Sequence, residues 1–200
     1  MQLQPPVAPL ILASGSPRRR ELLGLMGVPF EAVSLDADEE CEGTPAERVL
    51  ALADRKAAAA LAMYGDRLIL AADTLVARHG LVMGKPATMD EAAQMLLALS
   101  GGWHEVYTGV CLLDGKSGRK EVSFDRTRVR FSVLDKHLAQ LYVQTGEPMD
   151  KAGAYAIQGR GGMFVEEIKG SASNVIGLPM ALVRRMLSDF GVSVLYRLDV

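Results

Sequence analysis

Residues 11–23 read ILASGSPRRRELL, an apolar run that meets a Ser-Gly-Ser turn and continues into an arginine-rich segment. The apolar run predicts a strand, and Ser16 as N-cap with Pro17 at the first helical position predicts a helix directly after it. The turn then gathers hydroxyl groups, backbone N–H groups, the positive end of a helix dipole and the guanidinium groups of residues 18–20. This combination predicts a phosphate site; the alternative is a capped surface helix with solvated arginines.

Strand-like and helix-like segments alternate along the rest of the chain, which predicts a mixed α/β fold. Strands are expected at residues 30–35, 67–76, 154–157, 163–168 and 192–195, and a hairpin at residues 103–113 and 121–131 around the turn 114–118. Helices are expected at residues 44–64, from residue 88 to the stop at Gly101 and Gly102, at 135–144 and at 179–190. Capping-box patterns at Thr44 and Thr88 open the first two of these helices.

Length and composition predict one globular domain with a sizeable core, or two closely fused lobes. The chain has 200 residues, is 49% hydrophobic and carries a formal net charge of −2. We expect residues 1–9 to form an extended lead-in and residues 10–200 to form a single domain. Few aromatic residues and no basic excess argue against a nucleic-acid partner. The lack of a signal segment or long apolar run argues against a membrane, and the two isolated cysteines suit a cytoplasmic protein.

Three charged residues stand where a core argument would not place them. Asp73 interrupts an apolar strand, so it needs a cationic or hydrogen-bonding partner unless it caps a strand end. Lys56 falls on the apolar face of its predicted helix, where it has a functional role or extends its amine to solvent. Lys85 is held between a glycine and a proline, which aims its amine from a short loop. The acidic loop that ends at Glu39 gains meaning beside Asp73, because two such carboxylates suit Mg²⁺ or Mn²⁺.

Common nucleotide and metal motifs do not fit this chain. The segment 80–85 is one residue too short for a P-loop and is followed by proline, and the glycines at 159, 161 and 162 do not form the dinucleotide-binding pattern. The three histidines lack the spacing of a zinc hydrolase. The charged residues instead form a complementary set. The arginines and lysines at 18, 19, 56 and 85 would bind a polyphosphate, and Glu39 and Asp73 would hold a divalent ion.

Eight ordered blocks between residues 10 and 187 resemble the Maf family of nucleoside triphosphate pyrophosphatases. They are ASGSPRR at 13–19, DADE at 36–39, RKA at 55–57, ADT at 72–74, GKP at 84–86, DKAGAY at 150–155, QG at 158–159 and GLP at 177–179. The resemblance implies an elongated mixed sheet flanked by helices, close to the inosine triphosphatase architecture. It also implies an active cleft between two lobes within a single catalytic domain.

The family's reaction is the metal-dependent hydrolysis of a nucleoside triphosphate to the monophosphate and pyrophosphate, and the resemblance implies a role for each matching residue. Ser14, Arg18 and Arg19 would bind phosphate. Lys56 and Lys85 would neutralise charge on the leaving pyrophosphate. Asp73 would activate the attacking water and Glu39 would be a metal ligand, with both carboxylates near the Mg²⁺ or Mn²⁺ ion; which carboxylate takes which role is left open.

Three positions separate the substrate groups of the family. Relatives that act on dTTP and UTP have Arg, Thr and Gln where this chain has Arg18, Thr74 and Gln158; relatives that act on 7-methyl-GTP tend to have Trp, Gln and Glu. A glutamine amide both donates and accepts, which matches the O4 and N3–H edge of uracil or thymine. The resemblance therefore implies a pyrophosphatase that acts on dTTP and UTP. Modified pyrimidine nucleotides are further candidate substrates.

Two other functions stay open from the sequence. One is a 7-methyl-GTP pyrophosphatase of the same family, and the other is a nucleotide-binding regulator of cell division without useful turnover. The complete set of Glu39, Lys56, Asp73 and Lys85 favours an enzyme, because a binding protein has no need of a carboxylate among lysines. The substrate would be a small nucleoside triphosphate, and a homodimer is left open as the assembly.

Overall fold

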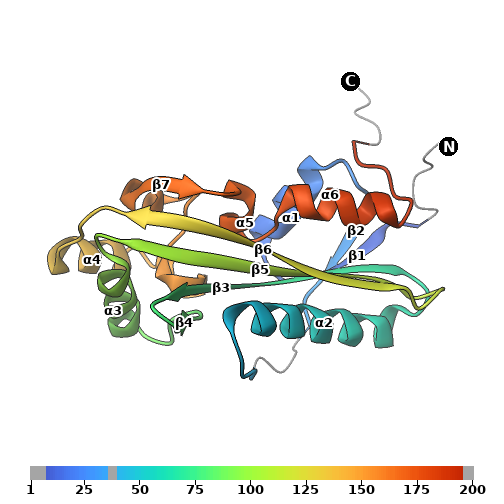
Figure 1. Ribbon diagram of the computed structural model, residues 1–200, viewed down its shortest axis with the longest axis horizontal. Helices are drawn as coiled ribbons and strands as arrows, with labels where there is room; N and C mark the ends of the chain where they lie inside the picture. Colours follow the sequence, from blue (N-terminus) through green and yellow to red (C-terminus); the bar gives the residue numbers. More distant parts are fainter. Residues whose placement is uncertain (1–7, 36–39, 196–200) are drawn as a thin grey trace. The chain divides into compact units, whose positions relative to one another are not determined.

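A computed structural model of the chain describes residues 8–35 and 40–195. Over these residues seven strands form one mixed sheet in the order β2-β1-β3-β5-β6-β7, with β4 paired to β3 (Figure 1). The strands are β1 (Leu10–Ala13), β2 (Phe30–Val33), β3 (Leu68–Arg78), β4 (Leu81–Met83), β5 (Trp103–Asp114), β6 (Lys120–Phe131) and β7 (Val165–Lys169). Strand β1 is parallel to β2 and β3, whereas β4 and β7 are antiparallel to their neighbours β3 and β6. The predicted α/β class is confirmed.

Helices and short 3₁₀ segments flank this sheet. The helices are α1 (Pro17–Leu25), α2 (Pro45–Tyr64), α3 (Met89–Leu99), α4 (Lys136–Val143), α5 (Ala172–Ile176) and α6 (Met180–Asp189). The 3₁₀ segments are η1 (Glu147–Asp150), η2 (Ala152–Ala154) and η3 (Arg160–Phe164). In the described part of the chain, no helix is both long and apolar enough to cross a bilayer.

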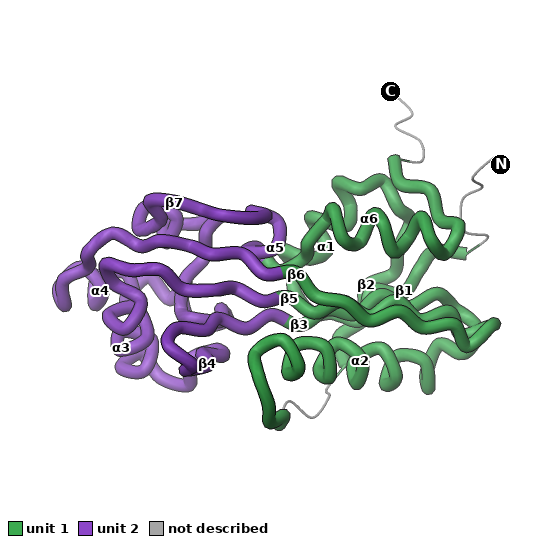
Figure 2. Tube along the Cα trace, viewed as in Figure 1, with its two compact units in different colours: residues 1–73, 108–125, 177–200 green, residues 74–107, 126–176 purple. Residues whose placement is uncertain are grey.

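The chain divides into two compact units, which Figure 2 shows in green and purple. The first unit holds residues 1–73, 108–125 and 177–200, and the second holds residues 74–107 and 126–176. Strands β3, β5 and β6 contribute residues to both units. Residues 1–7 lie outside the described part, so the extended lead-in stays a prediction, as do the single domain over residues 10–200 and the cleft between two lobes.

The first unit is built on a close contact between helix α2 and the sheet. Helix α2 covers one face of the sheet in this unit, and α1 and α6 cover the other face (Figure 1). Small residues make up the buried side of α2 at Ala53, Ala57 and Ala60, which pack against alternate residues of β1 and β3. The parallel register of Ile11 with Ile69 and of residue 13 with residue 71 gives those two strands one continuous apolar face. Alanines let a helix axis approach a sheet closely, which brings α2 near β3.

The second unit has its own core, in which aromatic rings meet edge to face. His104 lies 4.9 Å from Phe131 and 5.4 Å from Tyr155 between ring centroids, and its Nε2 is 2.9 Å from the hydroxyl of Tyr155. Burial, with a smaller contribution from the positive charge of Arg78, lowers the pKa of His104 to about 3. Its imidazole is therefore neutral at physiological pH and belongs to the core rather than to acid–base chemistry.

Most predicted elements are confirmed, and the capping patterns are confirmed with two differences. Thr44 and Glu47 form the complete capping box of α2. Thr88 accepts a hydrogen bond from Glu91 N at 3.1 Å, but the Glu91 carboxylate accepts from Ala87 N rather than from Thr88 N. Ser16 occupies the N-cap position of α1 without a capping hydrogen bond from its side chain.

Two predicted strands are wrong and a third begins later than expected. The segment 154–157 leaves η2 and enters a turn, because Ala154 has a positive φ of 59° and follows Gly153 at 69°, which no strand accommodates. Residues 163–164 belong to η3, so the predicted strand 163–168 begins only at β7. The segment 192–195 forms no strand, and Leu195 N donates instead to Met26 O at 2.7 Å.

The close approach of α2 to β5 predicts a strong effect of Gly109→Ala. A Cβ atom on Gly109 would overlap the carbonyl group of Val49 in α2, and backbone atoms cannot rotate away. We expect this change to lower the free energy of unfolding by about 2 kcal/mol or more, measured by urea denaturation. Gly24→Ala is the matched control, because no atom lies within 4 Å of the new methyl group. It should be neutral or stabilising by about 1 kcal/mol; equal losses would contradict the packing argument.

Candidate active site

Polar groups lie where the parallel strands β1 and β2 end beside β3. Strand β1 lies between β2 and β3, with Ala13 paired to Val33 on one side and to Ala71 on the other. Ser14 follows β1, and Asp73 lies inside β3, two residues past Ala71, the last residue of β3 that pairs with β1. Because β1 and β3 are parallel, Asp73 lies where β3 continues beyond the carboxyl end of β1, and open α/β sheets bind ligands at the carboxyl ends of their strands.

The turn after β1 is fixed by hydrogen bonds to the Ser14 hydroxyl and to the chain before α6. Ser14 is buried, and its Oγ accepts hydrogen bonds from Ser16 N and from Arg19 Nη1, both at 3.2 Å. Arg19 Nε donates to Gly177 O at 2.8 Å, which gives the GLP motif a structural role that the sequence did not reveal. Ser14 acts as the acceptor in both contacts, so its O–H can donate to a phosphate oxygen. Arg18 lies half-buried in the first turn of α1.

Lys56 and Asp73 form a largely buried ion pair. The Lys56 Nζ atom lies 2.6 Å from Asp73 Oδ1, and the two side chains are 15% and 11% exposed. Asp73 lies inside β3 rather than at a strand end, and the amine of Lys56 points at this carboxylate rather than to bulk solvent. The partner that Asp73 was expected to need is therefore Lys56. The alternatives, that Asp73 caps a strand end and that Lys56 extends its amine to solvent, are wrong. Thr74 is the next residue of β3, so its side chain leaves the opposite face of the strand.

Lys85 lies in the second unit, in a loop that is fixed on both sides of the lysine. Before it, Gly84 O accepts a hydrogen bond from Gly153 N at 3.0 Å. After it, Ala87 N donates to Glu91 Oε2 at 2.7 Å. The Lys85 side chain itself is exposed. The predicted short loop is confirmed, whereas the direction of the Lys85 amine and its membership in one site with Asp73 stay predictions.

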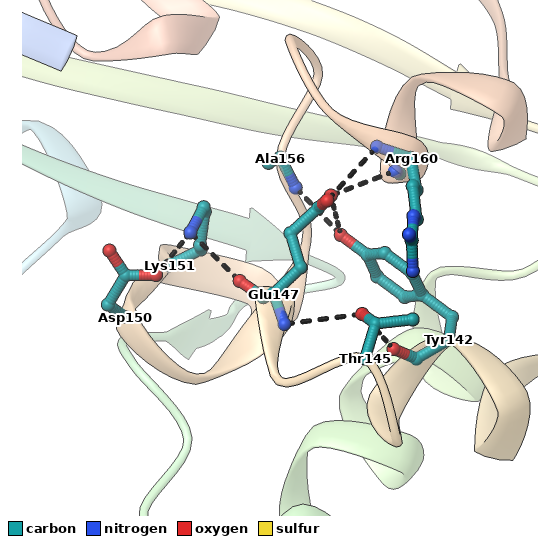
Figure 3. A network of polar contacts seen from close by, with 8 residues as sticks. Tyr142, Thr145, Glu147, Asp150, Lys151, Ala156 and Arg160 are labelled. Atoms are coloured by element: carbon teal, nitrogen blue, oxygen red, sulfur yellow. Dashed lines mark hydrogen bonds and ion pairs between the residues drawn. The ribbon is translucent and has the colours of Figure 1, made fainter.

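Gln158 also lies in the second unit, exposed on the glycine-rich loop 158–162. This loop is held by Glu147, whose carboxylate accepts hydrogen bonds from Arg160 N and Gly161 N, both at 3.1 Å (Figure 3). Sequence reasoning missed Glu147, because a glutamate in a Gly-Glu-Pro turn looks like any exposed loop residue. The contact of Gln158 with a nucleobase stays a prediction.

The carboxylate expected beside Asp73 for metal binding, Glu39, lies outside the described residues. In the described ranges no group of three or more His, Cys, Asp or Glu side chains comes together. Arg55 Nη1 donates to Glu40 O at 2.6 Å, which ties the chain just after the acidic segment to α2, one residue from Lys56. Of the two carboxylates expected to bind a metal ion, only that of Asp73 lies among the described residues, where it could supply one oxygen ligand. A site of this kind fits Mg²⁺, which usually takes one or two carboxylates and completes its shell with phosphate oxygens and water.

Cys111 is not suited to act as a nucleophile. Burial, followed by the negative charge of Asp54, raises the pKa of the Cys111 thiol to about 12, so the thiol stays protonated at neutral pH. Cys41 and Cys111 are both free cysteines. The candidate functional groups of the first unit are therefore the Ser14 hydroxyl, the Arg19 guanidinium group and the Lys56–Asp73 pair.

Comparison with known proteins agrees with this arrangement. The family described as Maf-like protein matches residues 9–190, a span that includes the β1 turn, the Lys56–Asp73 pair and the Gln158 loop. The chain belongs to the Maf family. This membership confirms the resemblance that the eight sequence blocks predicted.

Several full-length relatives of this Maf chain bear the name dTTP/UTP pyrophosphatase. The protein of Pelotomaculum thermopropionicum is 50% identical over 188 residues, which cover 93% of this chain and 98% of the relative. The protein of Moorella thermoacetica is 49% identical over 187 residues, which cover 92% and 96%. A protein of Bacillus cereus is 45% identical over 188 residues, which cover 92% and 97%.

The buried pair predicts strong energetic coupling between Lys56 and Asp73. Lys56→Met leaves the carboxylate of Asp73 in a largely dry position without its ammonium partner, at a cost of about 3 kcal/mol in unfolding free energy. In the Asp73→Asn background the same change should cost less than about 1 kcal/mol, because an amide needs no counter-charge. Urea denaturation of the four proteins gives the coupling. Equal costs of Lys56→Met in both backgrounds would show that the two side chains do not interact.

Proposed function

We propose that this Maf protein hydrolyses dTTP and UTP to the nucleoside monophosphate and pyrophosphate. The observation that carries the proposal is the buried Lys56–Asp73 pair in the unit in which Arg19 is hydrogen-bonded to the Ser14 hydroxyl, in the turn that we propose binds phosphate. A hydrolase of phosphoanhydrides needs a carboxylate to accept a proton from water and cations to balance the phosphates. The names of the similar proteins support the same reaction and the same substrates.

In the proposed mechanism the residues of the turn after β1 bind the triphosphate, and Asp73 in β3 activates water. Ser14 Oγ and the guanidinium groups of Arg18 and Arg19 hold phosphate oxygens at the N-terminus of α1. Lys56 engages Asp73 Oδ1 and fixes the orientation of the carboxylate, so we assign proton transfer from the attacking water to Asp73 Oδ2. The water attacks the α-phosphorus, and the bond to the bridging oxygen breaks to release pyrophosphate.

Charge balance during this step comes from two lysines and a divalent cation. Lys56 and Lys85 would offset the charge that builds on the departing pyrophosphate. Glu39 and Asp73 would hold Mg²⁺ or Mn²⁺, which when bound polarises phosphate oxygens and lowers the pKa of bound water. We assign Asp73 as the base and Glu39 as the main metal ligand.

The base preference in this proposal rests on Arg18, Thr74 and Gln158. The Gln158 amide can donate to O4 and accept from N3–H of uracil or thymine, whereas guanine presents two donors at the corresponding edge. Because Cys41 and Cys111 are free thiols, a cytoplasmic location is part of the proposal. A homodimer stays a prediction.

A panel of nucleoside triphosphates assayed for pyrophosphate release tests the reaction. With Mg²⁺ we expect turnover of dTTP and UTP above that of CTP, GTP and 7-methyl-GTP. Asp73→Asn should fold and lose activity by about a hundredfold or more, because an amide cannot accept the proton of water. Preference for 7-methyl-GTP would select the other substrate group of the family. Nucleotide binding without turnover in the wild type would favour the regulator.

Gln158→Glu tests the recognition of the base. The change replaces a donor and an acceptor by two acceptors, so O4 of uracil would face a carboxylate. A lost donor against a buried acceptor costs about 1–3 kcal/mol, so kcat/KM for UTP and dTTP should fall about ten- to a hundredfold. GTP, which offers donors, should lose less or gain. Equal losses for pyrimidine and guanine nucleotides would overturn base reading by Gln158.

A further inference from the structure

Glu147 is the centre of a polar network in the second unit, at the start of η1. Its Oε1 accepts hydrogen bonds from the Tyr142 hydroxyl at 2.8 Å and from Gly161 N at 3.1 Å, and its Oε2 accepts from Arg160 N at 3.1 Å (Figure 3). The Tyr142 hydroxyl in turn accepts from Ala156 N at 3.1 Å. Two side chains outside the glycine-rich loop therefore bind backbone N–H groups on both sides of Gln158.

Two glycines of the loop, Gly159 and Gly161, lie against the same two side chains. A Cβ on Gly159 would lie 2.5–2.6 Å from the carboxylate atoms of Glu147, and a Cβ on Gly161 would lie 2.6 Å from the Tyr142 hydroxyl. The loop thus lies close to the Tyr142–Glu147 pair at Gly159 and Gly161, where the lack of a side chain leaves room for the two polar groups. The hydrogen bonds on both sides of Gln158 therefore restrict the backbone conformation of the loop that carries it.

The backbone carbonyl of Glu147 is also hydrogen-bonded, to the amine of Lys151. Lys151 is 12% exposed, and its Nζ donates to Glu147 O at 2.8 Å while it also pairs with Asp150. Partial burial alone would raise the pKa of the Glu147 carboxyl, but hydrogen bonds from Tyr142, Gly161 and Arg160, with the charge of Lys151, lower it below its usual 4.5. A lowered pKa means that the stabilisation exists at neutral pH and disappears only as pH falls through that lowered value.

We propose that Glu147 is a positioning residue for nucleobase selection, which acts by fixing the loop that carries Gln158. The inference rests on the proposed function of this chain. A glutamine selects a base edge only if its amide is held at a fixed distance and angle, because a mobile amide can satisfy many edges. Glu147 supplies this rigidity through the backbone of Arg160 and Gly161, and it contributes no group to the reaction at the α-phosphorus.

The test is the ratio of kcat/KM for UTP to kcat/KM for GTP. Glu147→Gln turns one acceptor into a donor against a backbone N–H or the Tyr142 hydroxyl, so the ratio should fall about tenfold, mainly through a higher KM for UTP. Glu166→Gln, which removes a carboxylate that pairs with Arg130 in the same unit, is the matched control and should keep the ratio. Tyr142→Phe removes the supporting hydroxyl and should lower the ratio about threefold, which provides a second variant if Glu147→Gln does not fold.

A double-mutant cycle separates positioning from general destabilisation. In the Gln158→Ala background, Glu147→Gln should change the ratio by less than about twofold, because the amide through which Glu147 acts is gone. Parallel losses for UTP and GTP in the Glu147 and Tyr142 variants would overturn the inference and leave a structural role only. A wild-type protein that turns over UTP selectively, with an unchanged ratio in these variants, would overturn the inference alone. A wild type that releases no pyrophosphate from UTP would overturn the proposed function as well.

Discussion

The ion pair between Lys56 and Asp73 is the constraint on which the first unit depends. A carboxylate inside an apolar strand is costly to desolvate, and a single ammonium group 2.6 Å away offsets that cost. The lysine reaches it only because α2 lies close to the sheet, through an alanine face and through Gly109, where a side chain would overlap the helix backbone. The burial of the two charges therefore depends on the close packing of α2 against the sheet.

In both units, charged side chains form hydrogen bonds with the backbone of loops. Arg19 binds Gly177 O, Glu91 binds Ala87 N, and Glu147 binds the backbone of the Gln158 loop. Charge-assisted hydrogen bonds of this type are directional and stronger than neutral ones. They hold exposed residues such as Lys85 and Gln158 on defined backbones while leaving those side chains exposed to solvent, which suits recognition of a soluble, highly charged ligand.

Membership in the Maf family and the geometry of the strand ends lead to the same chemistry by separate arguments. The family match covers residues 9–190, whereas the geometric argument needs only the parallel register of β1, β2 and β3 and the groups at their ends. Burial keeps His104 neutral and Cys111 protonated at neutral pH, so neither of these two residues is suited to acid–base or nucleophilic chemistry. The carboxylate of Asp73 is buried beside Lys56 in the same unit, and its role as the base is part of the proposed function.

The sequence by itself determined the α/β class, the starts of α1, α2 and α3, the β5–β6 hairpin and the need of Asp73 for a partner. These follow from local signals: apolar periodicity, capping residues, turn residues and the cost of a buried charge. Only the tertiary structure decided that the partner is Lys56, that Gly177 anchors Arg19 and that Glu147 holds the Gln158 loop. It also decided that residues 154–157 turn rather than extend. Those outcomes join residues far apart in the chain, and no local pattern records which distant backbone atom a side chain will reach.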